Sequence, residues 1–226
     1  MRRFRHLAIT SIVAAALAAL PTTTAAAAGA VLTVGSTSGP AVAPGDSLSG
    51  TGNATFANSA NPSQNVMCTM SVGSKDATDP VPPGRATLII GSLGFSNCRL
   101  NGFTGANGIN SITTNASSTC PWNAVVDDTT NPATVTVSPA TISGCATSIS
   151  VDLNFQTMFG AVNCVYSPTN GTIVGTAPLG GGSVTFSNVP FTRTSGPGTT
   201  CFPMGNFSAT FNFTDATQGG GSVFVN

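Results

Sequence analysis

Histidine and glutamate are nearly absent from this chain of 226 residues. Glutamate does not occur, and the one histidine, His6, lies close to the N-terminus in a stretch that resembles an export leader. Histidine is the side chain that most often transfers protons at neutral pH, and glutamate is another frequent acid or base. An exported protein without either residue lacks the groups on which most enzymes depend. The sequence therefore predicts a protein without enzymatic activity.

Charged residues are also scarce and make up 6% of the chain. After the leader, Lys75, Arg85, Arg99 and Arg193 stand against seven aspartates, a net charge of about −3. Proteins that bind nucleic acids neutralise phosphates with clusters of lysine and arginine. This chain has no such cluster, so a nucleic-acid partner is not expected.

Residues 1–28 have the three parts of a secretory signal peptide. They contain a basic start with Arg2, Arg3 and Arg5, an apolar run and small residues near its end. The run is shorter than the roughly 20 residues that a membrane-spanning helix needs. The prediction is a cleaved signal peptide, by the general secretory or the twin-arginine route, and one domain over residues 29–226. The product is expected to be secreted, extracellular or attached to the cell surface, with no membrane span in the mature protein.

Six cysteines all fall after the leader: Cys68, Cys98, Cys120, Cys145, Cys164 and Cys201. An even number of cysteines in an exported protein predicts disulfides, here three. Six cysteines allow 15 pairings. We favour sequential pairing, first with second, third with fourth and fifth with sixth, because each bond would then brace neighbouring strands. The wide spacing and the missing histidine argue against a metal site, and no cofactor is expected.

Apolar residues alternate with polar ones in several segments, and no long segment has helical periodicity. Residues 148–155 and 206–214 are the clearest cases, since every second residue is apolar. Turn-forming pairs such as Asn107-Gly108 and Asn170-Gly171 separate further short strands. The predicted fold is all-β, an antiparallel β-sandwich of the immunoglobulin-like or jelly-roll-like type, with almost no helix and three disulfides.

A faint internal similarity relates the two halves of the chain. The pattern V-x-C-x-x-S occurs at residues 66–71 and 162–167, and each copy precedes a Phe-Ser-Asn triplet, at residues 95–97 and 186–188. The offsets differ, so chance similarity and a duplicated half both remain open. If the chain is duplicated, residues 127–132 are the expected seam.

Three segments resemble catalytic or metal-binding motifs. Gly45-Asp46-Ser47-Leu48 superficially matches the opening block of the GDSL esterases, but a serine nucleophile needs a base that this chain does not supply. A desolvated lysine can act as the base for a serine nucleophile. The sole lysine, Lys75, lies in the polar segment of residues 74–80, which is expected to form a solvated turn. Calcium at Asp76 with Asp79, or at Asp127 with Asp128, is a further alternative, although the chain has no EF-hand loop.

Trp122 and Tyr166 are the only tryptophan and the only tyrosine. Each follows a cysteine by two residues, so we expect both in the core, with ligand recognition as the alternative role. The C-terminus contains three glycines and then residues 222–226, which begin with Ser222 and end with Asn226. This short apolar segment is expected to be a strand that pairs with its own sheet. The alternative is self-assembly through a neighbouring molecule.

Several blocks resemble small exported, disulfide-containing β proteins of high-GC Gram-positive bacteria. They lie at residues 29–35, 66–69, 95–98, 162–166 and 191–202. The resemblance implies export and a disulfide-braced β fold, and it carries over no catalytic or binding residue. From the low charge and the polar strand faces we expect a non-enzymatic extracellular structural or surface-associated protein. The alternative is a binding module for a surface polysaccharide or a small apolar ligand.

Overall fold

A computed structural model describes residues 29–103 and 105–226, so the predicted signal peptide lies outside the described residues. These residues form thirteen β-strands and no helix, which confirms the all-β prediction. No described segment is a helix of the length and apolar character that crossing a membrane would need.

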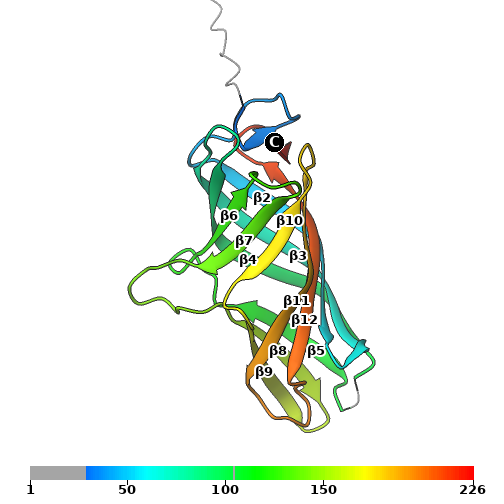
Figure 1. Ribbon diagram of the computed structural model, residues 1–226. Helices are drawn as coiled ribbons and strands as arrows, with labels where there is room; N and C mark the ends of the chain where they lie inside the picture. The colour runs from blue at the N-terminus through cyan, green and yellow to red at the C-terminus, as the bar shows by residue number, and fades with distance from the viewer. Residues whose placement is uncertain (1–28, 104) are drawn as a thin grey trace, which may run out of the picture.

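Eight strands close into an antiparallel β-barrel, with each strand hydrogen-bonded to the next (Figure 1). The ring closes because the last of these strands pairs with both the first and the seventh. In order around the ring they are β2 (Ser47–Asn58), β3 (Asn61–Thr78), β4 (Arg85–Asn101), β6 (Trp122–Asp127), β7 (Ala133–Pro139), β10 (Ile173–Ala177), β11 (Ser183–Ser195) and β12 (Met204–Asp215).

The expected sandwich is therefore wrong in its arrangement, although the two clearest predicted strands, at residues 148–155 and 206–214, overlap β8 (Val151–Thr157) and β12. Alternation shows only that each strand has one dry face and one wet face, and a sandwich and a barrel both satisfy that condition. Closure depends on twist and on the pairing of strands that lie far apart in the sequence. Here the β2–β12 pairing, from Leu48↔Asp215 to Asn58↔Gly205, removes the free edge that a sandwich would keep.

The barrel has an upper half, which contains β6, β7 and β10, and continues below these strands into a lower half whose interior is aromatic. The long strands β2, β3, β4, β11 and β12 run through both halves, and β5 (Gly108–Thr114), β8 (Val151–Thr157) and β9 (Gly160–Pro168) complete the lower wall (Figure 1). Its interior holds a cluster of rings around Phe56, with ring centroids 4.9 Å from Tyr166 and 5.6 Å from both Phe191 and Phe202. This half is filled by side chains.

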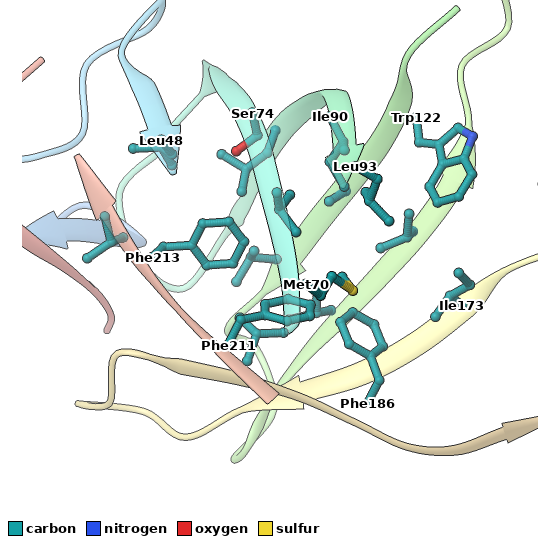
Figure 2. A pocket seen from close by; sticks show the side chains of 18 of the residues that line it. Leu48, Met70, Ser74, Ile90, Leu93, Trp122, Ile173, Phe186, Phe211 and Phe213 are labelled. Atoms are coloured by element: carbon teal, nitrogen blue, oxygen red, sulfur yellow. The ribbon is translucent and has the colours of Figure 1, made fainter. Parts of the chain in front are cut away.

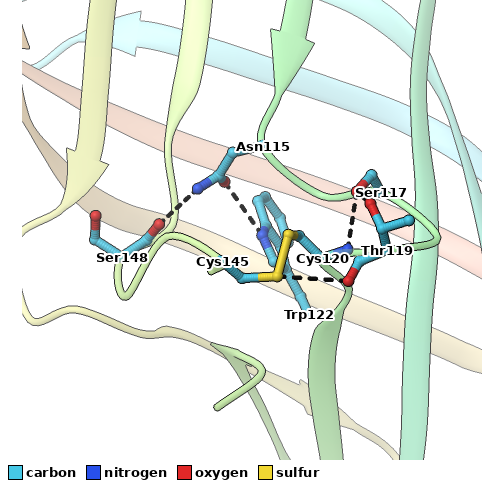
Figure 3. Close-up of a disulfide and its surroundings, with 7 residues drawn as sticks. All are labelled: Asn115, Ser117, Thr119, Cys120, Trp122, Cys145 and Ser148. Carbon is cyan, nitrogen blue, oxygen red and sulfur yellow. Dashed lines mark hydrogen bonds between the residues drawn. A yellow bond between two sulfur atoms is a disulfide. The ribbon is translucent and has the colours of Figure 1, made fainter. Parts of the chain in front are cut away.

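The three predicted disulfides are confirmed, with the sequential pairing. Cys68 bonds Cys98, Cys120 bonds Cys145, and Cys164 bonds Cys201. The second bond joins the two loops, residues 115–121 and 140–150, that interrupt the wall between the upper and lower halves (Figure 3). Disulfides of this kind are typical of proteins that fold in an oxidising compartment.

The two Phe-Ser-Asn triplets adopt the same local structure. Asn97 in β4 and Asn188 in β11 both have a φ of 51°, and they are the only non-glycine residues with positive φ among those described. Each lies in a bulge where two residues lie opposite one on the neighbouring strand. Residues before the turn at 127–132 supply four barrel strands, and residues after it supply the other four. The internal similarity therefore has a structural counterpart.

A short ribbon of two strands lies at the upper end of the molecule. It consists of β1 (Leu32–Val34) and β13 (Gly221–Val225), which pair from Leu32↔Val225 to Val34↔Val223. β13 leaves the barrel after two pairs with β12, at Thr214↔Ser222 and Asp215↔Gly221. The C-terminal segment therefore pairs with its own chain, as expected. Its use in self-assembly stays a prediction, since β13 would first have to leave both neighbours.

Candidate functional site

The upper half of the barrel encloses a cavity of about 70 Å³ (Figure 2). Its wall comes from the inward faces of all eight barrel strands, and its roof from the β1–β13 ribbon through Leu32, Val223 and Val225. The remaining wall is almost entirely aliphatic and aromatic, with Leu88, Ile90, Val126, Val135, Val137, Ile173, Phe186, Phe207, Phe211 and Phe213 among its members.

Trp122, one of the two weak ligand candidates, lines this cavity. Its side chain is 3% exposed, and its Nε1 donates a hydrogen bond of 3.2 Å to Asn115 Oδ1 (Figure 3). The same Asn115 donates to the Ser148 carbonyl at 2.7 Å and accepts from the Ser150 amide at 2.9 Å. Asn115 thus fixes the indole in its place in the cavity wall.

Tyr166, the other candidate, belongs to the aromatic cluster of the lower half and does not line the cavity. It is fully buried, and its hydroxyl donates to the Phe202 carbonyl at 3.0 Å. Both aromatic residues are therefore core residues, and only Trp122 also faces an enclosed space.

Ser74 supplies the one hydroxyl group in the cavity wall. The side chain is 6% exposed, and its Oγ has no hydrogen-bond partner among the described residues. Buried hydroxyl groups normally have a partner, because an unsatisfied one loses its bonds to water without replacement. The apolar wall thus contains one hydroxyl group, that of Ser74, which has no partner among the described residues and can bind a guest.

Three buried carboxyl groups lie one layer above the cavity. Asp76 follows Ser74 by two residues on β3, Asp215 follows Phe213 on β12, and Asp46 precedes Leu48 of β2. Residues two apart on a strand share a face, so each aspartate continues the inward face on which a cavity residue lies. Asp76 is 3% exposed and Asp215 is 0% exposed.

The three carboxyl groups differ in their hydrogen bonds. Asp46 Oδ2 accepts bonds of 2.9 Å from the Ala43 amide and from Gln218 Nε2. Asp215 Oδ1 accepts from the amides of Thr217 and Gln218, whereas its Oδ2 has no N–H or O–H donor among the described residues. Neither oxygen of Asp76 has one. The carboxyl groups of Asp46 and Asp215 also lie within hydrogen-bond reach of each other.

These surroundings change the acidity of the carboxyl groups in opposite directions. The hydrogen bond from Gln218 lowers the pKa of Asp46. Burial, and then the charges of Asp46 and Asp215, raise the pKa of Asp76 from 3.8 to about 6. Burial also raises the pKa of Asp79 to about 7, against the hydrogen bond of 2.9 Å that its Oδ1 accepts from the Leu32 amide in the roof.

The expectation of a polar turn around Lys75 is wrong. Strand β3 continues to Thr78, so Ser74 and Asp76 face the interior while Lys75 faces solvent. The inward series Met70, Val72, Ser74, Asp76 changes from apolar to polar as the strand reaches the end of the barrel. The alternation was present in the sequence, but a polar residue at an inward position looks the same as a residue in a turn.

Ser47 of the GDSL-like block and the Asp127-Asp128 pair do not line the cavity, although Leu48 of that block does. Ser47 of the GDSL-like block is exposed, and its amide donates to Thr217 Oγ1 at 2.9 Å. Asp127 forms an ion pair of 2.7 Å with Arg85, while Asp128 accepts from the Gly84 amide. Within residues 29–103 and 105–226, no three side chains of metal-binding type are grouped so that they could hold an ion.

Comparisons with known proteins found no matching family model, no matching curated protein and no matching solved structure.

Proposed function

We propose that this protein is an extracellular binding protein that takes up a small apolar molecule, or an apolar chain of a few carbons, inside its barrel. The observation that carries the proposal is the enclosed upper cavity, whose wall is apolar except for the Ser74 hydroxyl. Ligand sites of this kind are concave and apolar, with a few polar groups that orient the guest. Secretion, as the leader predicts, would place the binding site outside the cell.

The size and lining of the cavity support this function. Protein interiors are packed densely, and voids larger than a water molecule are few. A water needs only about 10–15 Å³ and two or more polar partners, whereas this cavity has about 70 Å³ and one free hydroxyl. An apolar guest would restore the dispersion contacts that the wall residues lack. Side chains occupy most of the lower half, where the described residues leave a void of only about 20 Å³.

The fluorescence of Trp122 provides a direct assay, because it is the only tryptophan and lines the cavity. We would titrate straight-chain alcohols from propan-1-ol to octan-1-ol. Affinity should rise by about 0.8 kcal/mol for each added CH₂ group until the chain fills the cavity, and then fall. A rise that never stops would indicate binding to an open surface instead.

A matched pair of variants on one strand locates the binding. Val126 points into the cavity, and Val125 lies on the opposite face of β6. Val126→Phe should fill the space and abolish the fluorescence response, whereas Val125→Phe should leave it unchanged. An equal response from both variants would contradict binding inside the barrel.

A second candidate function is the surface-associated structural role that the composition suggested. It is favoured by the turn between β8 and β9, where Met158 is 80% exposed and Phe159 is 99% exposed. Two large apolar side chains that are exposed next to each other form an apolar patch, and exposed apolar patches mark sites of contact with a partner. Substituting both by serine should then reduce co-sedimentation with insoluble cell-wall polysaccharide, or reduce the multimer mass measured by light scattering. Unchanged behaviour in both assays would remove this candidate.

A further inference from the structure

Four oxygen atoms at the upper end of the cavity and in the layer above it lack a partner among the described residues. They are Ser74 Oγ, both carboxylate oxygens of Asp76, and Asp215 Oδ2. All three side chains are more than nine-tenths buried. Ser74 lies in the cavity wall, and Asp76 is the next inward residue on the same strand, about 7 Å further along. The hydroxyl and the carboxylates therefore form a polar end to an otherwise apolar space.

Among the residues that the structure describes, no positive charge compensates this end. Lys75, the nearest basic residue in the sequence, lies on the outer face of β3, and the only ion pair among the described residues joins Arg85 to Asp127. A buried carboxylate without a partner is unfavourable, and it gains most from a positive charge that also donates hydrogen bonds. The unpartnered oxygens thus match a donor that comes from outside the chain.

We infer that the ligand of this barrel is a small alkyl amine, whose ammonium group lies among Ser74, Asp76 and Asp215 while its alkyl chain occupies the apolar cavity. This inference rests on the proposed function, since the alkyl chain needs the cavity. An ammonium group has three N–H donors and no acceptor, so it suits a set of oxygen acceptors. An alcohol has one donor and no charge. A metal ion is a poorer match, because no described group of side chains is arranged to hold one.

The β1–β13 ribbon completes the site. Its residues Leu32, Val223 and Val225 cover the cavity, and β13 enters the ribbon directly after Gly219 and Gly220, which both have positive φ. Asp215 pairs with Gly221 at the point where β13 leaves the barrel. An ammonium group at Asp215 would therefore be bound where the roof joins the wall.

Three probes with the same alkyl chain test the inference: n-butylamine, butan-1-ol and butanoate, each titrated at pH 7.5 with Trp122 fluorescence as the signal. Because hydrogen bonds to charged groups are stronger than neutral ones, butylamine should bind at least about tenfold tighter than butan-1-ol. Butanoate should bind more weakly than either, because the carboxylates repel it.

Two variants and one control identify the group that recognises the amine. Asp76→Asn should lower the affinity for butylamine by about tenfold and leave that for butan-1-ol within about twofold. Ser74→Ala should reduce butylamine binding in the same direction and serves if Asp76→Asn does not fold. Asp127→Asn changes the net charge equally, but on the outer face of β6, and should not alter the preference.

The outcomes separate the two proposals. If butan-1-ol binds as tightly as butylamine, or if the amine preference survives both Asp76→Asn and Ser74→Ala, the amine inference is overturned while the apolar site stands. If Asp127→Asn removes the preference as well, the effect is one of net charge and the inference also fails. If none of the three probes changes the fluorescence, the cavity is not a binding site and both proposals fall.

Discussion

Replacing Asp76 by asparagine should stabilise the ligand-free protein at neutral and alkaline pH but not at acidic pH. Asp76 is buried, neither of its oxygens has a hydrogen-bond partner among the described residues, and it lies near the charges of Asp46 and Asp215. Its pKa is raised from 3.8 to about 6. One pKa unit corresponds to about 1.4 kcal/mol, so the ionised form lowers the free energy of unfolding by about 3 kcal/mol.

The direction follows from proton binding. Between pH 3.8 and 6 the folded protein holds a proton on Asp76 that the unfolded chain has released, so stability falls as the pH rises through this window. Below it both states are protonated and the penalty is absent. Above it the penalty is complete. Asparagine does not titrate, and Asp76→Asn should therefore differ little from the wild type at pH 4 and gain about 3 kcal/mol at pH 8.

Urea unfolding at pH 4, 5, 6, 7 and 8 with the disulfides intact measures this difference. Taking the variant minus the wild type at each pH removes the pH dependence that other titrating groups give to both proteins, and a pH-independent effect of the substitution remains as a constant offset. Asp127→Asn is the control, because hydrogen bonds from Thr129 lower the pKa of Asp127 and reverse the expected sign. A difference for Asp76→Asn that stays constant from pH 4 to pH 8, or that favours the wild type at pH 8, would refute the reasoning.

Three further predictions concern the roof, the aromatic half and the interrupted wall. Deleting residues 219–226 removes β13 and with it two roof residues of the cavity. Both the unfolding midpoint and the affinity for butan-1-ol should therefore decrease. An unchanged affinity would contradict the assignment of β13 to the roof. Tyr166→Phe leaves the buried Phe202 carbonyl without its hydrogen bond and should lower the free energy of unfolding by about 1–2 kcal/mol; a loss well below this in urea unfolding would argue against that bond. Replacing Cys120 and Cys145 by alanine opens a loop with a sequence separation of 25. The free energy of unfolding should fall by about 3 kcal/mol, because the unfolded chain gains conformational freedom. An unchanged thermal midpoint would contradict this prediction.

The candidate site was only partly visible in the sequence. Trp122 was identified as a residue to examine, and the structure places it in the cavity wall. Ser74 and Asp76 were assigned to a polar turn, because two polar residues beside a lysine are typical of solvated segments. Asp215 had no local signal, since it ends a strand of alternating residues and precedes a turn. Their common location depends on the pairing of β2 with both β3 and β12.

The sequence by itself determined the properties that depend on neighbouring residues. Alternation along residues 206–214 specified a strand with one buried face, the absence of helical periodicity specified an all-β chain, and the spacing of the cysteines favoured the sequential disulfides that the structure contains. These are local or nearly local properties.

Only the tertiary structure decided that the sheet closes into a barrel, that its upper half keeps an apolar cavity, and that Asp46, Asp76 and Asp215 lie together above it. Closure joins β2 to β12, strands separated by most of the chain, and the alternation of each strand is the same whether or not that pairing forms. The physical reason is that a period of two residues sets which face is buried, while twist and strand pairing set what that face encloses.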